Sequence, residues 1–213
     1  MTRPRRIVVG ISGASGALYA QRTIEQLVLR NIEVHLVVSP MGQRLLHDEL
    51  GMEGVDLDVL SGAKIDQFRG TPIQLHHYRD VGSVIASGSF LHDGMVIVPC
   101  SSNSLSAVAV GSQNNLMHRA AAVTLKERRK LILVHRETPL GMTDIRNMQL
   151  ATESGALICP ANPGFYLLPS GIDDLINFVV GKILDLLEIE HDLKTRWEDQ
   201  KIPMAGDDES KSC

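Results

Sequence analysis

The residues whose types and spacing best suit chemistry lie at positions 7–16, where an apolar run meets a turn rich in glycine and serine and a helical pattern follows. A strand, a tight turn and a helix N-terminus together form an anion site, because the first amides of a helix lack internal partners and the helix dipole favours negative charge. Gly13 and Gly16 allow unusual backbone angles, and Ser12 and Ser15 supply hydroxyl groups. An ordinary strand–helix turn with a serine cap is the alternative, since glycine fingerprints produce many false positives.

A second apolar run also ends in small polar residues. Met95–Pro99 has the continuous apolar character of a strand buried on both faces, and it leads into Ser101–Ser104. Open α/β sheets bind ligands outside the carboxyl ends of their strands, where the strand order reverses. With strand order 3-2-1-4-5 this end lies beside the first turn, which favours a ligand site. Serine capping of a helix is the alternative for 101–104.

The periodicity of apolar residues predicts an α/β fold with a parallel sheet. The expected strands are 7–11, 33–38, 95–99, 131–134 and 156–159, and the expected helices are 17–30, 41–50, one beginning near 105, 116–129, 143–154 and 171–187. Ile145 and Ile172 are expected on the apolar faces of the last two helices. Ser170 and Asp173 are expected to cap the last one.

Ser39, at the end of the second expected strand, discriminates between nucleotides. A dinucleotide fold usually places an Asp or Glu there to hold the adenosine ribose. The glycines also fall as Gly10-x-x-Gly13-x-x-Gly16 instead of GxGxxG. Both departures weigh against a dinucleotide and favour a mononucleotide with one phosphate.

Length and composition narrow the class of protein. The 213 residues suit a single globular α/β domain over 1–202, followed by a polar tail at 203–213. A hydrophobic content of 44% argues against a disordered chain, and no apolar run approaches the roughly 20 residues of a membrane span. The net charge of −4 argues against nucleic-acid binding, and three separated cysteines favour a reduced, cytoplasmic compartment.

Histidines do not indicate a metal site. The eight histidines show no ligand spacing, and the adjacent His76 and His77 match no zinc pattern. Glycine and proline break any period across 51–80, so this stretch is interpreted as a surface or rim segment.

Charged residues that could face an anion come later in the chain. Arg119 and Lys126 lie seven residues apart on helix 116–129, so they share a face and could both reach one anion. Arg136 and Glu137 follow strand 131–134. A solvated helix face is the alternative for the charges of helix 116–129.

With these strand ends in hand, the sequence resembles the UbiX-type flavin prenyltransferases from about Arg6 to Trp197. The matching blocks are Gly10–Gly16, Pro99–Ser101, Leu105–Ser106, Asn114–Leu116, Arg119–Ala121, Leu125–Arg129, Arg136–Pro139 and Pro163–Tyr166. The resemblance implies a Rossmann-like, flavodoxin-like three-layer sandwich, trimers stacked into dodecamers and no metal. It implies transfer of a prenyl group from dimethylallyl monophosphate to N5 and C6 of reduced FMN. The product, prenylated FMN, would serve a UbiD-type decarboxylase.

The resemblance also implies roles for individual residues. The flavin would contact Gly13, Ala14, Ser15, Ser39, Ser101, Ser102, Asn103, Ser104 and Arg136, with Ser15 and Glu49 near N5. The prenyl phosphate would be held by Arg119, Lys126, Glu137, Tyr166 and Lys182. Many members carry Arg where Lys182 stands, and Asn103 also departs from relatives. The FMN phosphate is expected mainly at Ser101–Ser104.

These roles agree with the chemistry that the transfer requires. Breaking the carbon–oxygen bond leaves an allyl cation and a phosphate, and Arg119, Lys126 and Lys182 would stabilise that phosphate. Glu49 would move a proton at N5, and Glu137 would balance the surplus positive charge.

Two other functions remain open from the sequence. The run Pro99–Ser104 also resembles the Pro-Ala-Ser-Ala-Asn-Thr motif of FMN-dependent cysteine decarboxylases, for which His76 or His77 would have to act as the catalytic histidine. A non-catalytic FMN carrier is the third possibility. The choice between dimethylallyl monophosphate and pyrophosphate is also open.

Overall fold

The computed structural model describes residues 3–62 and 73–196. A six-stranded sheet lies at its centre with the order β3-β2-β1-β4-β5-β6, and every neighbouring pair is parallel. The strands are β1 Arg6–Ile11, β2 Glu33–Val38, β3 Ile73–His76, β4 Met95–Cys100, β5 Leu131–His135 and β6 Leu157–Ile158. The predicted α/β class and parallel sheet are therefore confirmed, and β1 lies beside β4, as the assumed strand order required.

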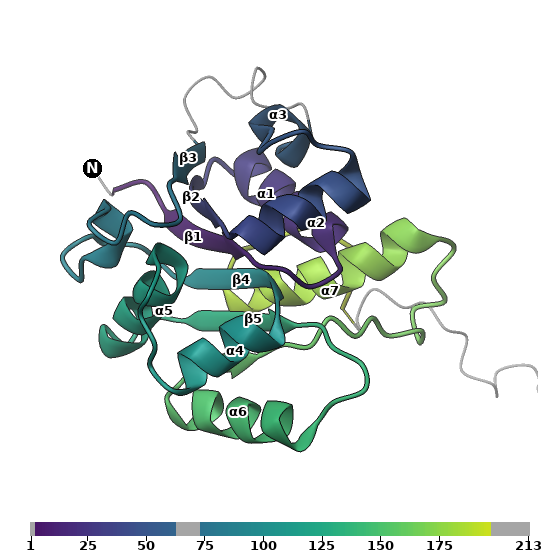
Figure 1. Cartoon of the computed structure of the whole chain (residues 1–213). Coiled ribbons are helices and arrows are strands. Elements are labelled where there is room, and N and C mark those ends of the chain that lie inside the picture. Colours follow the sequence, from purple (N-terminus) through teal and green to yellow (C-terminus); the bar gives the residue numbers. More distant parts are fainter. Residues whose placement is uncertain (1–2, 63–72, 197–213) are drawn as a thin grey trace, which may run out of the picture.

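Helices cover both faces of this sheet and produce three layers (Figure 1). The helices are α1 Ala17–Leu29, α2 Pro40–Leu50, α3 Leu57–Leu60, α4 Ser102–Ala109, α5 Leu116–Lys126, α6 Met142–Glu153 and α7 Ile172–Leu186, with a short 3₁₀ turn, η2, at Val84–Ala86. Apolar residues of α1, α2, α3 and α7 form one core cluster, and those of η2, α4, α5 and α6 form the other. No helix in the described ranges is long and apolar enough to cross a membrane.

Some local expectations prove wrong. Ile145 is 49% exposed and Ile172 is 70% exposed, so neither belongs to the core. Ser170 donates to Asp174 at the start of α7, whereas Asp173 pairs with Arg22 of α1. The spacing of apolar residues predicts the apolar face of a helix by itself. Which turns of that face are buried depends on the neighbouring elements that pack against it.

His76 lies in β3 and is buried, so the interpretation of 51–80 as a rim segment is wrong at this position. The predicted tail at 203–213 and residues 197–202 of the predicted domain lie outside the described residues.

Gly42 marks a close approach between α2 and β1. A Cβ at this position would lie 2.4 Å from the carbonyl oxygen of Ile11 and 3.1 Å from Val38. We expect Gly42→Ala to lower the free energy of unfolding in urea by about 1–3 kcal/mol, since the backbone cannot yield as a side chain can. Gly54→Ala is the matched control, because no atom lies within 4 Å of its added Cβ. Equal stabilities of the two variants would contradict this reading of the packing.

His92 makes the fold sensitive to acid. Its side chain is buried, Nδ1 lies 3.0 Å from the carbonyl oxygen of Gly94, and burial lowers its pKa to about 4. In the unfolded chain His92 takes up a proton near pH 6.5, whereas in the folded protein it stays neutral until the pH approaches 4. The stability that the neutral His92 contributes is therefore present above pH 6.5 and is lost as the pH falls toward 4. We expect His92 to account for about 2 kcal/mol of lost stability between pH 7 and pH 5. Urea unfolding at both pH values should show a smaller loss in His92→Gln than in the exposed control His47→Gln; equal losses would contradict the assignment.

Candidate active site

The carboxyl ends of β1 and β4 are joined by Ser12. Its amide and its hydroxyl both donate to the carbonyl oxygen of Pro99, at 3.2 and 2.9 Å, and its hydroxyl accepts from the amide of Ser101 at 2.8 Å. The prediction that two serine-rich strand ends lie side by side is confirmed. The Ser12 hydroxyl joins these two strand ends.

Glu49 of α2 occupies the N-terminus of α1. Its Oε2 accepts from the amides of Gly16 and Ala17 at 3.0 and 2.7 Å. The amides expected to bind a ligand's anion therefore hold a carboxylate of the protein itself. This places Glu49 beside Ser15 and agrees with the expectation that the FMN phosphate lies elsewhere.

The two glycines of the turn serve different purposes. Gly16 has a φ of 129°, which a residue with a side chain rarely adopts, as predicted. Gly13 is not in the left-handed region. A Cβ there would lie 2.4 Å from the Cβ of Met41, so Gly13 is required by the close packing of α2.

Arg136 and Glu137 bring the end of β5 to the same edge. The Arg136 side chain donates from Nε to the carbonyl oxygen of Ser15 at 3.3 Å, and its amide donates to Cys100 at 3.2 Å. Glu137 accepts from the hydroxyl of Ser102 at 3.5 Å. One edge of the sheet thus gathers a carboxylate, a guanidinium and the first turn of α4 around the Ser15 turn.

Several of the predicted flavin-binding serines are engaged within the protein. Ser39 accepts from the amide of Gly42 at 2.9 Å and begins α2, and Ser101 accepts from the amide of Ser104 at 3.3 Å and begins α4. Ser104 is buried, and its hydroxyl lies 3.3 Å from Nε2 of His118. The capping alternative is therefore right for the hydroxyl of Ser101. Asn103 is exposed in the first turn of α4, and Ser102 is half-buried.

His135 is a residue of this edge that the sequence analysis did not single out. It is buried at the end of β5, with Nε2 3.2 Å from the hydroxyl of Ser102. A hydrogen bond from Ser102 also lowers the pKa of Asp144. The sequence feature that could have identified His135 is its position at the end of an expected strand, directly before Arg136.

Tyr166 and Lys182 lie together on the α7 side. The ring of Tyr166 packs edge-on against Phe178 of α7, with 5.6 Å between centroids, and Lys182 follows Phe178 one helical turn later. Lys182 is exposed, and its charge acts on Cys159, which follows β6. Both residues predicted to hold the prenyl phosphate from this side are therefore accessible.

The structure does not bring Lys126 to this edge, so within one chain Lys126 does not join the other residues that the resemblance assigns to the prenyl phosphate. Lys126 ends α5, which runs back across the sheet and leads to the amino end of β5. It pairs with Glu127 at 3.4 Å. Arg119 binds the carbonyl oxygen of Ala86 and the side chain of Gln113, outside the cluster around Ser15.

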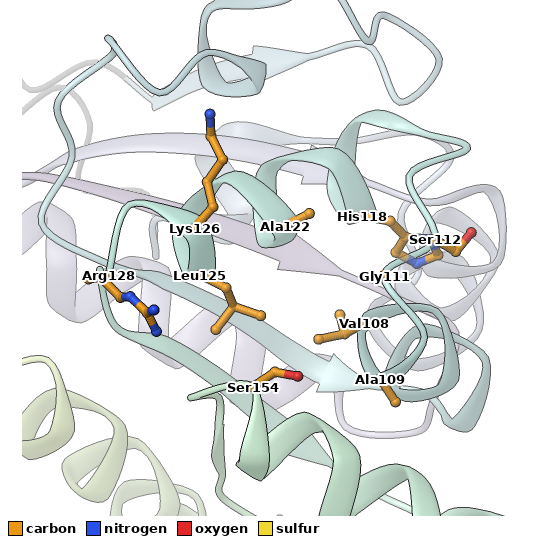
Figure 2. A pocket seen from close by; sticks show the side chains of 10 residues that line it. All are labelled: Val108, Ala109, Gly111, Ser112, His118, Ala122, Leu125, Lys126, Arg128 and Ser154. Carbon is orange, nitrogen blue, oxygen red and sulfur yellow. The ribbon is translucent and has the colours of Figure 1, made fainter.

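A cavity of about 310 Å³ lies beside Lys126, between α5 and the C-terminal ends of α4 and α6. Figure 2 shows the side chain of Lys126 extending away from Leu125 and Arg128, which line that cavity. Lys126 is thus exposed to solvent.

The described residues hold no group of three or more potential metal ligands from His, Cys, Asp or Glu. Cys100 and Cys159 are free and buried, and burial raises the pKa of Cys100 to about 12. Neither thiol is placed to act as a nucleophile at neutral pH.

Comparison with known proteins identifies the class. The Flavoprotein family model matches residues 1–183, so the chain belongs to the Flavoprotein family. Flavin prenyltransferase UbiX of Halalkalibacterium halodurans is 43% identical over 193 residues, which cover 91% of this chain and 93% of that protein. The chain belongs to the UbiX family of flavin prenyltransferases.

Two solved structures agree. The crystal structure of AnUbiX (PadA1) in complex with FMN and dimethylallyl pyrophosphate matches with a TM-score of 0.79 and 39% identity, covering 88% of this chain and 94% of that one. A dodecameric FMN-dependent UbiX-like decarboxylase from Escherichia coli O157:H7 matches with a TM-score of 0.79 and 35% identity, covering 90% and 98%.

Proposed function

We propose that this flavin prenyltransferase transfers a dimethylallyl group from dimethylallyl monophosphate to N5 and C6 of reduced FMN, forming prenylated FMN. The observation that carries this proposal is the meeting of Ser15, Glu49 and Arg136 at the edge where β1 and β4 end. The related AnUbiX, whose structure contains FMN and dimethylallyl pyrophosphate, supports it.

The residues at this edge fit a flavin mononucleotide. The exposed Asn103 and half-buried Ser102 lie in the first turn of α4, whose amides suit the phosphate. Arg136 and the 13–16 turn lie beside them and suit the ring. When bound and reduced, the flavin supplies a nucleophilic nitrogen.

Glu49 is the residue we assign to proton movement at N5. Its carboxylate is held by two backbone amides directly after Ser15, so it is oriented without help from a mobile side chain. Oriented carboxylates of this kind act as general bases.

The prenyl phosphate would lie against the α7 side, held by Tyr166, Lys182 and Glu137. Arg119 and Lys126 would come from a neighbouring subunit, since α5 carries Lys126 away from the edge of its own chain. A dodecamer, the assembly of the UbiX-like relative, would provide such neighbours; we propose that it is built from stacked trimers. Subunit walls would also exclude water from the allyl cation.

The product would pass to a UbiD-type decarboxylase in the cytoplasm. The reaction needs no metal, because the cations that stabilise the departing phosphate are side chains.

Anaerobic incubation with reduced FMN tests the function directly. Dimethylallyl monophosphate and dimethylallyl pyrophosphate are supplied in separate reactions, and the flavin is analysed by mass spectrometry. We expect the flavin to gain the mass of one prenyl group with the monophosphate. Flavin that stays bound but unchanged with both donors would contradict the proposal and favour an FMN carrier; product with the pyrophosphate alone would correct the donor.

A further inference from the structure

A buried hydrogen-bond chain crosses three strands of the sheet, and the proposed function does not use it. Arg6 of β1 donates from Nε to Glu33 at 2.8 Å, and the other oxygen of Glu33 lies 2.9 Å from Nε2 of His35. Nδ1 of His35 lies 2.9 Å from Nε2 of His76, and Nδ1 of His76 lies 2.7 Å from the hydroxyl of Ser83. Both histidines are buried, at 1% and 7% exposure.

The protons of this chain have a single arrangement. Burial opposes the charge of Glu33, but hydrogen bonds from Arg6 and His35 outweigh it and hold the pKa of Glu33 below its usual value. The carboxylate only accepts, so His35 donates from Nε2 and must accept at Nδ1 from His76. His76 then accepts at its own Nδ1 from the Ser83 hydroxyl. Burial lowers the pKa of both histidines, in keeping with two neutral rings.

Both ends of residues 83–90, here termed the 83–90 loop, rest on this chain. Ser83 donates to His76, and at the other end the ring of Phe90 meets His35 edge-on with 4.7 Å between centroids. Arg129, which follows α5 in the chain, holds the loop by donating to the carbonyl oxygens of Gly88 and Phe90, both at 2.8 Å. The loop is therefore fixed to the sheet.

The same loop contacts Arg119 directly and reaches Lys126 through Glu127, the two cations that the proposed function assigns to the prenyl phosphate. The carbonyl oxygen of Ala86 accepts from Nε of Arg119 at 3.3 Å. Gly88 packs against Glu127, where an added Cβ would lie 2.2 Å from Oε1, and Glu127 pairs with Lys126 at 3.4 Å. A shift of the loop would thus displace both charges.

We propose that Ser83, His76 and His35 are positioning residues that fix the 83–90 loop and thereby place Arg119 and Lys126 for the prenyl phosphate. This inference rests on the proposed function, in which those two cations hold the phosphate. The three residues do not touch either substrate; they act through the loop.

Ser83→Ala tests the inference with little risk to folding, since it removes one hydroxyl. We expect the KM for the prenyl phosphate to rise about fivefold, the effect of one lost hydrogen bond, while the affinity for FMN stays unchanged. Ser83→Thr, which keeps the hydroxyl, should restore the KM. Ser61→Ala is the matched control, because the hydroxyl of the buried Ser61 likewise makes a hydrogen bond, which it donates to the carbonyl oxygen of Asp58 at 3.0 Å. A purely structural role would lower the melting temperature in Ser83→Ala without moving this KM, and would overturn the inference.

Arg119→Ala separates the inference from the function beneath it. We expect Arg119→Ala to raise the KM for the prenyl phosphate, and Ser83→Ala to raise it less in that background than in the wild type, because only the effect through Lys126 remains. An effect of Arg119→Ala with none of Ser83→Ala overturns the positioning inference alone. No effect of Arg119→Ala on a prenylating enzyme overturns the assignment of Arg119, and the inference with it.

Discussion

Glu49→Gln is expected to slow flavin prenylation by about 10²- to 10⁴-fold while FMN binding is retained, because removal of an oriented general base costs that much. The glutamine keeps an oxygen that can accept from the amides of Gly16 and Ala17, so the turn around Ser15 should survive. Single-turnover mass analysis of the flavin measures the rate, and fluorescence quenching on titration with FMN measures binding.

Glu53→Gln is the control for this substitution. Glu53 is exposed and follows α2 closely in the chain. The substitution therefore removes the same charge from the same region, but not at the Ser15 turn. We expect it to prenylate at the wild-type rate. Turnover by Glu49→Gln at a rate within tenfold of this control would remove Glu49 from the mechanism.

Oligomers that contain both Glu49→Gln and Arg119→Ala chains are expected to recover activity, if Arg119 reaches the site from a neighbouring subunit. Glu49→Gln chains lack the base but carry Arg119, and Arg119→Ala chains carry the base. In oligomers formed by coexpression at equal amounts, about a quarter of the sites would combine an intact Glu49 with an intact Arg119 from the next subunit. At a prenyl-phosphate concentration far below the raised KM of Arg119→Ala, each preparation is nearly inactive alone, and we therefore expect the mixed oligomers to reach about a quarter of the wild-type activity.

The outcome depends on where Arg119 acts. If each site were built within one chain, every site of a mixed oligomer would carry one defect and no activity would return. Two differently tagged copies of Glu49→Gln, coexpressed and purified in the same way, show what mixing alone does. Absence of recovery in verified mixed oligomers would contradict a site shared between subunits.

Local patterns were sufficient for much of the fold. The alternation of short apolar runs with helical stretches predicted β1, β2, β4 and β5, because each element's periodicity depends on its own residues. β3 was missed, since four residues between irregular segments carry too little pattern. The serine that begins α4 was recognisable as a cap for the same local reason.

The residues of the site divide in a similar way. Their types and order along the chain were sufficient for a resemblance to the flavin prenyltransferases, which the comparisons confirm. The roles of individual residues remain predictions. The edge of the sheet that Lys126 reaches was not predicted, because a shared helix face does not tell where the helix end lies.

The sequence by itself determined the fold class and the family, since these follow from periodicity and from blocks of neighbouring residues. Only the tertiary structure decided that Glu49 occupies the N-terminus of α1 and that His35 and His76 share a hydrogen bond. The partners in these contacts lie 32 and 41 positions apart in the chain, in elements whose own patterns are complete without them. Hydrogen-bonding groups so far apart meet only when sheet pairing and helix packing bring their elements together, so no local pattern predicts them.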